Sequence, residues 1–351
     1  MTREVRVPSG TVLTIACPGS SNSIEQLGEV SVEATCSSGV MVVTAGIIRP
    51  LSTLGCSKTI RSSIKNHLGS CGVGDHGQLN IIGFRIGELF YEQIFVCFDY
   101  NAQTTLYTRH VVHGASIGAK DTDSSRPSFK SSTGYFNVSM NTVYSQASQS
   151  QLLINLLGDE NLANSLFDKS KYYFARGHLT PDADFVTEPE QDATYYYINA
   201  APQWQAFNNG NWKLLEYAIR DLAEQNGRSL RVYTGGSGVL ELDDINSNPV
   251  EVHLGMALGE SVVPVPAVTW KVIHDEYTNC AVAVVGVNNP HLTSPPLTLC
   301  QDLCSSIPWI DFNTTDLTRG YTYCCTVADL RAAVPDVPDL GDICLLSGNG
   351  C

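Results

Sequence analysis

The chain has 351 residues, of which 43% are hydrophobic, so it is long enough for two average domains or for one large domain with an extension. No apolar run approaches the roughly 20 residues that a membrane-spanning helix needs, so we expect no transmembrane segment. The net charge of −14 argues against a general affinity for nucleic acid. However, residues 236–351 hold 3 basic and 14 acidic side chains, whereas residues 101–235 hold 11 and 13, so the middle of the chain can present a local basic surface.

Twelve cysteines are many for a cytosolic protein of this length, and none lies between residues 98 and 279. They predict disulfide bonds formed in an oxidising compartment, and therefore a secreted protein. The alternative is a zinc site built from Cys300, Cys304, Cys324 and Cys325. It is disfavoured because the spacing does not repeat a Cys-x-x-Cys pair and no histidine lies beside these residues.

Five of the cysteines lie at or before Cys97 and seven at or after Cys280. Both numbers are odd, so if all twelve pair within the chain, at least one bridge joins the N-terminal region to the C-terminal region. The competing account is one free thiol in each region. Two glycosylation sequons, which begin at Asn137 and Asn313, also fit a secreted glycoprotein.

Residues 1–100 have the pattern of a β-rich domain held by disulfides. Short apolar, partly β-branched runs separated by Gly, Ser and Cys predict strands at 12–15, 40–43 and 93–96. No motif with a recognisable chemistry occurs in this region.

From about residue 101 the pattern changes to mixed α and β, and we place a second domain at 101–351, ending in an acidic, cysteine-rich tail. Leucines at helical spacing predict a helix within 148–167, and an amphipathic pattern predicts another over 211–225. Apolar, aromatic or β-branched runs predict strands at 171–174, 194–198, 230–234 and 269–273.

The residues that carry chemistry lie between 174 and 220, in the order strand, strand, helix. The segment 174–178 reads Phe-Ala-Arg-Gly-His, and the segment 199–203 reads Asn-Ala-Ala-Pro-Gln. Asn208 stands before the amphipathic helix. This order can bring a base and a metal ligand together across a ββα unit.

These residue types suit the hydrolysis of a phosphodiester bond. Water must lose a proton near neutral pH, and histidine is matched to that task, which indicates His178 as the general base. The negative charge that builds on the phosphate calls for a hard cation. Mg²⁺ prefers oxygen ligands and keeps most of its waters, so the amide oxygen of Asn208 can suffice, with Mn²⁺ as the alternative cation. An arginine nearby adds a bidentate contact to the phosphate.

The same residues resemble the DNA/RNA non-specific endonucleases, a family built on a ββα-metal finger. Its motif is Asp-Arg-Gly-His, then a strand end Asn-x-x-Pro-Gln, then a helix Asn-x-x-x-Trp-x-x-x-Glu-x-x-x-Arg. Roughly residues 105–280 are covered by the resemblance, and Arg126-Pro-Ser-Phe looks like the family's upstream Arg-x-x-Phe segment. The matching positions are Arg176, Gly177, His178, Asn199, Pro202, Gln203, Asn208, Trp212, Glu216 and Arg220.

The cysteine-rich flanks and the segments 144–148 and 204–210 look more specifically like the crustacean digestive nucleases, a branch that includes duplex-preferring enzymes. One position departs from the family pattern, because Ala175 stands where many members have Asp. The orientation of His178, or of a metal-bound water, must therefore come from elsewhere, and Glu216, reaching the cation through water, is a candidate for that role.

The resemblance implies a role for each site residue. We expect four catalytic residues, one metal ligand and two substrate contacts: His178, Arg126, Arg176 and Glu216; Asn208; and Arg220 and Gln203. Plainer alternatives stay open for some of them. Asn208 can be only a helix N-cap, Arg176 can pair with a carboxylate of the protein, and Glu216 can lie on a solvated helix face or pair with Arg220 at i, i+4.

The expected fold is α+β, with a ββα-metal nuclease core around an antiparallel sheet and a β-rich, disulfide-bonded N-terminal domain. We expect a secreted Mg²⁺-dependent endonuclease that prefers double-stranded DNA, takes RNA as a second substrate and leaves 5′-phosphate ends. Nucleic acid is the expected partner, without a membrane or protein partner. The alternative is a catalytically inactive nucleic-acid-binding protein on the same fold.

Overall fold

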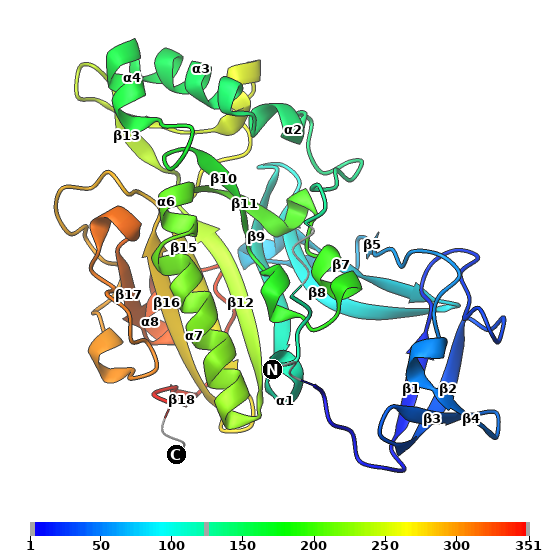
Figure 1. Cartoon of the computed structure of the whole chain (residues 1–351). Coiled ribbons are helices and arrows are strands. Elements are labelled where there is room, and N and C mark those ends of the chain that lie inside the picture. The colour runs from blue at the N-terminus through cyan, green and yellow to red at the C-terminus, as the bar shows by residue number, and fades with distance from the viewer. Residues whose placement is uncertain (1–3, 123–125, 349–351) are drawn as a thin grey trace.

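The computed structural model describes residues 4–122 and 126–348. Its centre is a ten-stranded sheet, in which eight strands follow the order β17-β16-β15-β12-β9-β8-β7-β5 while β18 and β6 pair with β16 and β7 (Figure 1). Neighbours along this path are antiparallel. The strands are β5 (Ser63–Lys65), β6 (Ser70–Cys71), β7 (Gly77–Ile86), β8 (Leu89–Asp99), β9 (Thr104–His113), β12 (Ser229–Ser237), β15 (Val268–Asp275), β16 (Cys280–Val287), β17 (Thr322–Cys325) and β18 (Cys344–Leu345). The fold is therefore α+β around an antiparallel sheet, as predicted.

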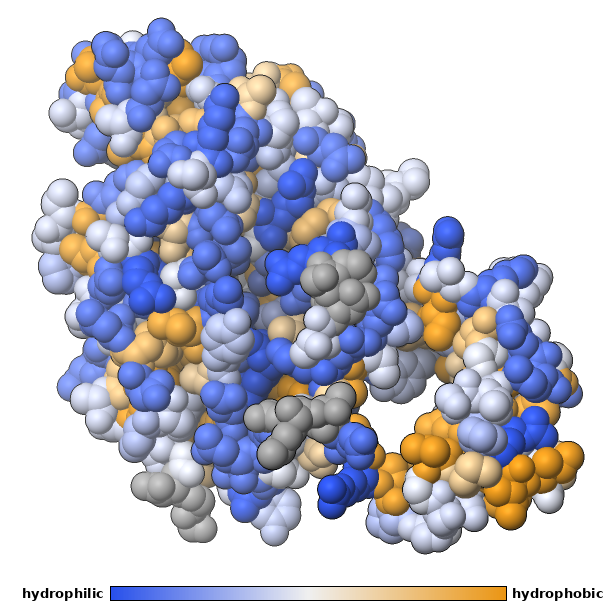
Figure 2. Space-filling view, in the orientation of Figure 1, coloured by the Kyte–Doolittle hydropathy of each residue, from blue (hydrophilic) through white to orange (hydrophobic). Residues whose placement is uncertain are grey.

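A second, four-stranded antiparallel sheet lies to one side of the molecule, in blue in Figure 1. Its strands are β1 (Val12–Ala16), β2 (Ser31–Ser38), β3 (Met41–Thr44) and β4 (Ile47–Pro50). It has a small core of its own, which includes the Cys17–Cys56 disulfide. Apolar surface is visible over this region at the lower right of Figure 2. The exposed large apolar side chains of the small sheet and its turns are Val12, Val40, Ile47, Ile48 and Leu51.

We expected a domain boundary at residue 100, but the chain passes from the small sheet to the large sheet earlier, between β4 and β5. The strands β5 to β8 belong to the large sheet, because β8 pairs with β9 and buries Ile94, Val96 and Phe98 in a cluster that also contains Tyr196 and Ile198. Residues up to about 100 are therefore shared between the small sheet and the core of the larger body.

Helices cover the large sheet, and α7 (Asn211–Asn226) crosses the face formed by β12, β15 and β16 (Figure 1). This helix forms where its apolar spacing predicted, and it ends at Gly227 in a left-handed conformation with φ of 61°. The helix expected within 148–167 is divided in two, because Gly158 adopts φ of 72° and the Asp159 side chain caps the second part. In the described part of the chain, no helix is long and apolar enough to cross a bilayer.

The remaining elements are short. The other helices are α1 (Gly114–Ile117), α2 (Met140–Val143), α3 (Gln146–Leu157), α4 (Glu160–Leu166), α5 (Glu188–Asp192), α6 (Gln205–Asn208) and α8 (Val327–Ala333). The 3₁₀ turns are η1 (Leu51–Thr53), η2 (Val73–Asp75), η3 (Asp182–Asp184), η4 (Tyr197–Asn199), η5 (Leu254–Leu258), η6 (Cys304–Ser306) and η7 (Leu317–Arg319). A separate hairpin joins β13 (Glu241–Asp243) to β14 (Pro249–Glu251).

A two-stranded antiparallel unit, β10 (Phe174–His178) and β11 (Ala200–Trp204), leads directly into α6 and α7. The strand expected at 194–198 is wrong, because Tyr197–Asn199 form the 3₁₀ turn η4 and the strand is β11, which starts at Ala200. Asn199 is fully buried and ties the two strand ends together, because its side chain donates to the carbonyls of Thr180 and Thr194 and accepts from the Thr180 amide. The expected strand–strand–helix order of the core is therefore present.

Five disulfides form among the described residues: Cys17–Cys56, Cys71–Cys97, Cys280–Cys344, Cys300–Cys325 and Cys304–Cys324. The alternative of a zinc site at the last four of these cysteines is therefore wrong. Every one of the five bridges stays within its own region of the chain. Cys36 is unpaired among the described residues, and Cys351 lies outside them. A disulfide between the N-terminal and C-terminal regions therefore stays a prediction, and Cys36 and Cys351 are the two cysteines left to form it.

A buried carboxylate joins the core elements behind the ββα unit. Asp184, 4% exposed, lies 2.7 Å from Nη1 of Arg220 on α7 and 2.8 Å from Nε2 of His110 on β9. These bonds hold the pKa of the Asp184 carboxyl well below its ordinary value despite its burial. Nearby, the buried Lys271 ammonium donates to the carbonyl of Leu179, next to His178 in the chain.

We predict that Asp184→Asn lowers the free energy of unfolding by about 3–5 kcal/mol, because it leaves the buried Arg220 guanidinium without its charge partner. Urea denaturation followed by circular dichroism measures this loss. Asp221→Asn, which removes an exposed carboxylate from α7, is the matched control and should change stability by no more than about 0.5 kcal/mol. Equal midpoints for the two variants would contradict a central role of Asp184.

Candidate functional site

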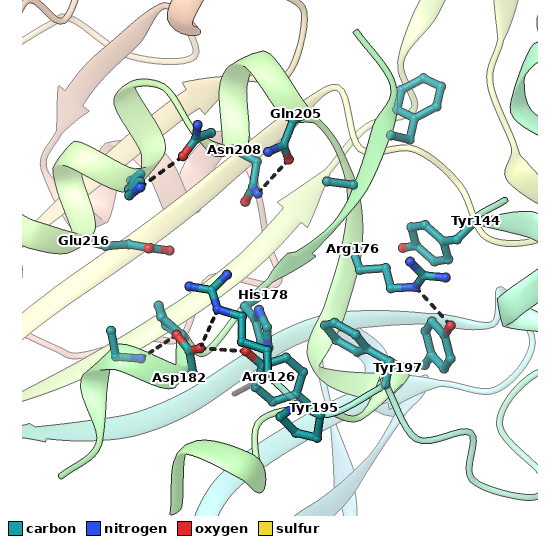
Figure 3. A pocket seen from close by; sticks show the side chains of 18 of the residues that line it. Arg126, Tyr144, Arg176, His178, Asp182, Tyr195, Tyr197, Gln205, Asn208 and Glu216 are labelled. Carbon is teal, nitrogen blue, oxygen red and sulfur yellow. Dashed lines mark hydrogen bonds and ion pairs between the residues drawn. The ribbon is translucent and has the colours of Figure 1, made fainter. Parts of the chain in front are cut away.

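A cleft of about 860 Å³ lies where β10, η3, α6 and the first turns of α7 meet (Figure 3). It brings together six of the seven site residues that we predicted: Arg126, Arg176, His178, Asn208, Glu216 and Arg220. Its charged lining is basic on balance, with Lys120, Arg126, Arg176, Lys213 and Arg220 against Asp182 and Glu216. An acidic chain thus presents a locally basic cleft, as the distribution of charge along the sequence allowed.

His178 is the last residue of β10, and two aromatic rings hold its imidazole in place. The Phe129 ring centroid lies 4.9 Å away, and the Tyr195 ring meets the imidazole edge to face at 4.7 Å. Nε2 is buried without a hydrogen-bond partner among the described residues, and the His178 side chain lines the cleft. The imidazole is therefore positioned by packing rather than by a direct bond to a carboxylate.

Burial lowers the pKa of His178 to about 4, because the surroundings penalise the charged imidazolium. The negative charge of Asp182 opposes this shift, whereas the positive charges of Arg126 and Lys271 add to it. At neutral pH the imidazole is therefore uncharged, which is the form that a general base needs.

Gly177, the residue before His178, must be glycine because β10 and β11 approach each other closely there. A Cβ atom at Gly177 would collide with the side chain of Gln203 on β11. Gln203 itself is fully buried, and its Nε2 donates to Thr269 Oγ1 at 3.2 Å. The prediction that Gln203 contacts the substrate is therefore wrong. Its side chain is buried between β10 and β15, out of reach of a ligand in the cleft.

Asn208 is the last residue of α6, and its side chain reaches into the cleft (Figure 3). The amide nitrogen donates to Gln205 Oε1 at 3.4 Å, which leaves the amide oxygen directed away from that bond. The plainer interpretation of Asn208 as a helix N-cap is wrong, because Gly210 is the N-cap of α7.

The start of α7 is fixed by the cysteine-rich C-terminal region. Asn211 Nδ2 donates to the carbonyls of Asn313 and Gly320 at 2.8 and 3.0 Å. Gly210 packs so closely that a Cβ atom there would collide with the carbonyls of Ala206 and Arg319. The tail that follows the large sheet therefore supports the turn that carries Asn208.

Glu216 lies on α7 and lines the cleft, eight residues after Asn208 in the chain. Burial raises the pKa of its carboxyl to about 7, and the positive charges of Lys271 and Arg220 only partly oppose this. The i, i+4 pairing of Glu216 with Arg220 is wrong, because the Arg220 guanidinium bonds to Asp184 instead. Arg220 is only 6% exposed, so its charge is committed to the protein, although its side chain lines the cleft.

Arg176 is held by aromatic rings. Its guanidinium carbon lies 5.1 Å from the Tyr144 ring and 5.7 Å from the Tyr197 ring, and Nε donates to the Tyr197 hydroxyl at 3.0 Å. In the described ranges no carboxylate pairs with Arg176, so the alternative of an internal ion pair is wrong. The guanidinium keeps its charge for an anion in the cleft.

The other predicted arginine lies at the mouth of the cleft. Arg126 is 76% exposed, and its Nε lies 3.9 Å from Asp182 Oδ2. Asp182 also accepts a hydrogen bond from the Tyr195 hydroxyl at 2.7 Å. Sequence reasoning missed Asp182, Tyr195 and Lys271, because no motif spacing relates them to His178 before the chain is folded.

The cleft fits a hard divalent cation. The amide oxygen of Asn208 and the carboxylate of Glu216 are oxygen donors, and neither is engaged in an ion pair among the described residues. Mg²⁺ and Mn²⁺ accept such donors together with water. Cysteine and histidine, which would favour zinc, contribute only His178 to the lining.

Comparison with known proteins adds the following findings. A family model described as DNA/RNA non-specific endonuclease matches residues 75–330. The chain is similar to a salivary endonuclease of Lutzomyia longipalpis, with 30% identity over 332 residues that cover 93% of this chain and 73% of that protein. It is also similar to salivary protein Tsal1 of Glossina morsitans morsitans, with 28% identity over 335 residues, or 94% of this chain and 81% of that protein. The crystal structure of the EndoG/EndoGI complex aligns with a TM-score of 0.43 and 16% identity, covering 72% of this chain and 90% of that chain.

We predict that the imidazole of His178 stays uncharged down to about pH 5 in the metal-free protein, because burial lowers its pKa to about 4. Nitrogen-15 NMR of the imidazole ring, with a His178→Gln variant to assign the signal, measures the midpoint. Free histidine in the same buffer is the reference, with an ordinary pKa of about 6.5. A midpoint above 6 would mean that the ring is solvated rather than enclosed by Phe129 and Tyr195.

Proposed function

Since this chain belongs to the family of DNA/RNA non-specific endonucleases, we propose that its cleft cleaves phosphodiester bonds within nucleic acid chains, with His178 as the general base. The observation that carries the proposal is the uncharged imidazole of His178, which shares one cleft with the uncommitted guanidinium of Arg176 and the amide of Asn208. A base, an anion-binding group and a ligand for a hard cation are the groups that phosphodiester hydrolysis needs.

The residues act in the following way. His178 takes a proton from a water molecule, and the water oxygen attacks the phosphorus atom. Arg126 and Arg176 bind the phosphate oxygens on which negative charge builds. The bond to the 3′-oxygen breaks, that oxygen takes up a proton from solvent, and the products carry 5′-phosphate and 3′-hydroxyl ends.

A divalent cation completes the site. We propose Mg²⁺, with Mn²⁺ as the alternative, held by the amide oxygen of Asn208 directly and by the carboxylate of Glu216 through water. Such a cation would stabilise the negative charge that develops during hydrolysis. The pKa of Glu216, raised to about 7 by burial, falls when a cation is near, because positive charge favours the carboxylate.

We propose secretion on two independent grounds. Five disulfides are typical of an oxidising compartment, and the similar proteins named salivary endonuclease and salivary protein Tsal1 are salivary by name. The sequon residues Asn137 and Asn313 are both exposed, so both sites can accept a glycan.

The preferred substrate in this proposal is double-stranded DNA, with RNA as a second substrate. Digestion of matched duplex DNA, single-stranded DNA and RNA in Mg²⁺, each with an EDTA control, tests it. We expect duplex DNA to be cleaved fastest and EDTA to stop cleavage. Binding of duplex DNA without nicking of a plasmid would instead identify an inactive binding protein on the same fold.

We predict that His178→Ala lowers kcat on plasmid DNA by roughly 10²–10⁴-fold, because general-base catalysis is lost. The folded state should persist, since the imidazole makes no hydrogen bond through Nε2. His113→Ala, which removes an exposed histidine from β9 outside the cleft, is the matched control. Retention of more than a tenth of the wild-type rate by His178→Ala would rule out His178 as the base.

We predict that Asn208→Ala raises the Mg²⁺ concentration for half-maximal activity by at least roughly 10–100-fold, because losing even a residue that only supports a metal ligand costs that much. Isothermal calorimetry with Mg²⁺ alone should show the same loss of affinity. The control is Asn155→Ala, which removes an exposed amide from α3. An unchanged metal titration would mean that the cation is held elsewhere.

A further inference from the structure

The site lacks a carboxylate at position 175, yet a different carboxylate lies close to His178. Ala175 occupies the first position of the Ala-Arg-Gly-His segment and has no charge to offer. Asp182 follows His178 by four residues, in the η3 turn, and Figure 3 shows its side chain directed toward Arg126, Tyr195 and His178. In the described part of the chain, Asp182 and Glu216 are the acidic residues that line the cleft.

The contacts of Asp182 differ from those of a solvated surface residue. Its side chain is 25% exposed, Oδ2 accepts the Tyr195 hydroxyl at 2.7 Å, and Oδ1 accepts the Ala183 amide at 2.7 Å. Arg126 Nε lies 3.9 Å from Oδ2. Burial raises the pKa of the Asp182 carboxyl, but His178, the Tyr195 bond and Arg126 lower it by more. Asp182 is therefore ionised at the pH at which the site works.

Tyr195, one of the partners of Asp182, also packs against His178. The Tyr195 ring that Asp182 holds through its hydroxyl packs edge to face against the His178 imidazole at 4.7 Å. The same ring packs against Phe129 at 5.1 Å, and Phe129 covers the imidazole from another direction at 4.9 Å. Release of the Tyr195 hydroxyl would therefore loosen the wall that orients His178.

The charges around His178 give Asp182 a second effect. The charged groups that act on the imidazole are Arg126 from the mouth of the cleft, Lys271 from β15 and Asp182 from η3. The two cations disfavour the imidazolium, and Asp182 favours it. When His178 takes a proton from water, Asp182 is thus the negative charge that offsets the new positive charge.

We propose that Asp182 is the positioning carboxylate of this site, holding Tyr195 against His178, anchoring Arg126 at the mouth of the cleft and stabilising the imidazolium as it forms. This inference rests on the proposed function. Asp182 acts through its neighbours, so we assign it no contact with the substrate and no ligation of the cation. Glu216, which the resemblance suggested as a candidate for orienting His178 or a metal-bound water, is not among the charged groups that act on the His178 imidazole.

The test uses Asp182→Asn, with Asp221→Asn as the control that removes an exposed carboxylate from α7. We expect Asp182→Asn to lower kcat by up to about 10²-fold, the cost of misplacing a reacting group by about 1 Å, while the Mg²⁺ concentration for half-maximal activity stays unchanged. We also expect the acid limb of the pH profile of kcat/KM to move to lower pH, because the charge that favours the imidazolium is gone. A purely structural role would not move this limb.

Two partner variants separate the contributions. Tyr195→Phe keeps the ring and loses the hydroxyl, so we expect a smaller loss of kcat with the acid limb in place. In a double-mutant cycle, Asp182→Asn should lower kcat by a smaller factor in the Arg126→Ala background than in the wild type. The reason is that Asp182 acts in part through Arg126. Additive effects, together with a wild-type rate for Tyr195→Phe, would overturn the proposal.

The remaining outcomes are equally decisive. If Asp182→Asn behaves like Asp221→Asn, or if it mainly raises the Mg²⁺ requirement, Asp182 is not a positioning residue of His178. NMR titration of His178 in the metal-free Asp182→Asn protein needs no activity, and we expect a midpoint below that of the wild type. Inactive wild-type protein would therefore contradict the proposed function and still leave the effect of Asp182 on His178 measurable. If Asp182→Asn does not fold, Tyr195→Phe and Arg126→Ala carry the test, and wild-type kinetics in both would overturn it.

Discussion

The architecture of the cleft depends on one buried carboxylate, that of Asp184. It ties the turn after β10 to α7 through Arg220 and to the large sheet through His110, so the strand that ends at His178 and the helix that carries Glu216 keep a fixed relation. A buried ion pair of this kind adds little net stability, but its loss leaves an uncompensated charge in the core. The arrangement also explains why Arg220 is unavailable to a substrate.

The distribution of charge reconciles an acidic protein with a basic cleft. Most of the excess acid lies in residues 236–351, whereas the charged residues that line the cleft come from earlier in the chain and are mainly basic. Aromatic rings, rather than carboxylates, hold the guanidinium of Arg176. Its positive charge therefore remains available for an anion, while the Asp182 carboxylate lies close enough to His178 to act on its charge.

Local sequence determined much of this molecule. The apolar period of α7 and the β-branched runs of β12 and β15 predicted those elements, since each pattern reflects the face that an element buries. The strand–strand–helix order predicted that His178 and Asn208 can meet, because β10, β11, α6 and α7 follow one another within about 50 residues. The resemblance to the nuclease family added Glu216 to this site. Because these four elements are close in the chain, few arrangements of their side chains are possible. The sequence motif therefore predicts most of the geometry of this unit.

Tertiary structure alone decided the features that depend on distant parts of the chain. Gln203 is buried because it packs between β10 and Thr269 on β15, and Arg220 is committed because Asp184 reaches it from another element. Asp182 approaches His178 only after the η3 turn folds back toward Tyr195 and Arg126. The sequence by itself determined the α+β class, the helix α7 and the residue types of the cleft. The partner of each charged or polar group was decided by long-range packing, because a side chain's periodicity indicates the face that it occupies and not the group that it meets there.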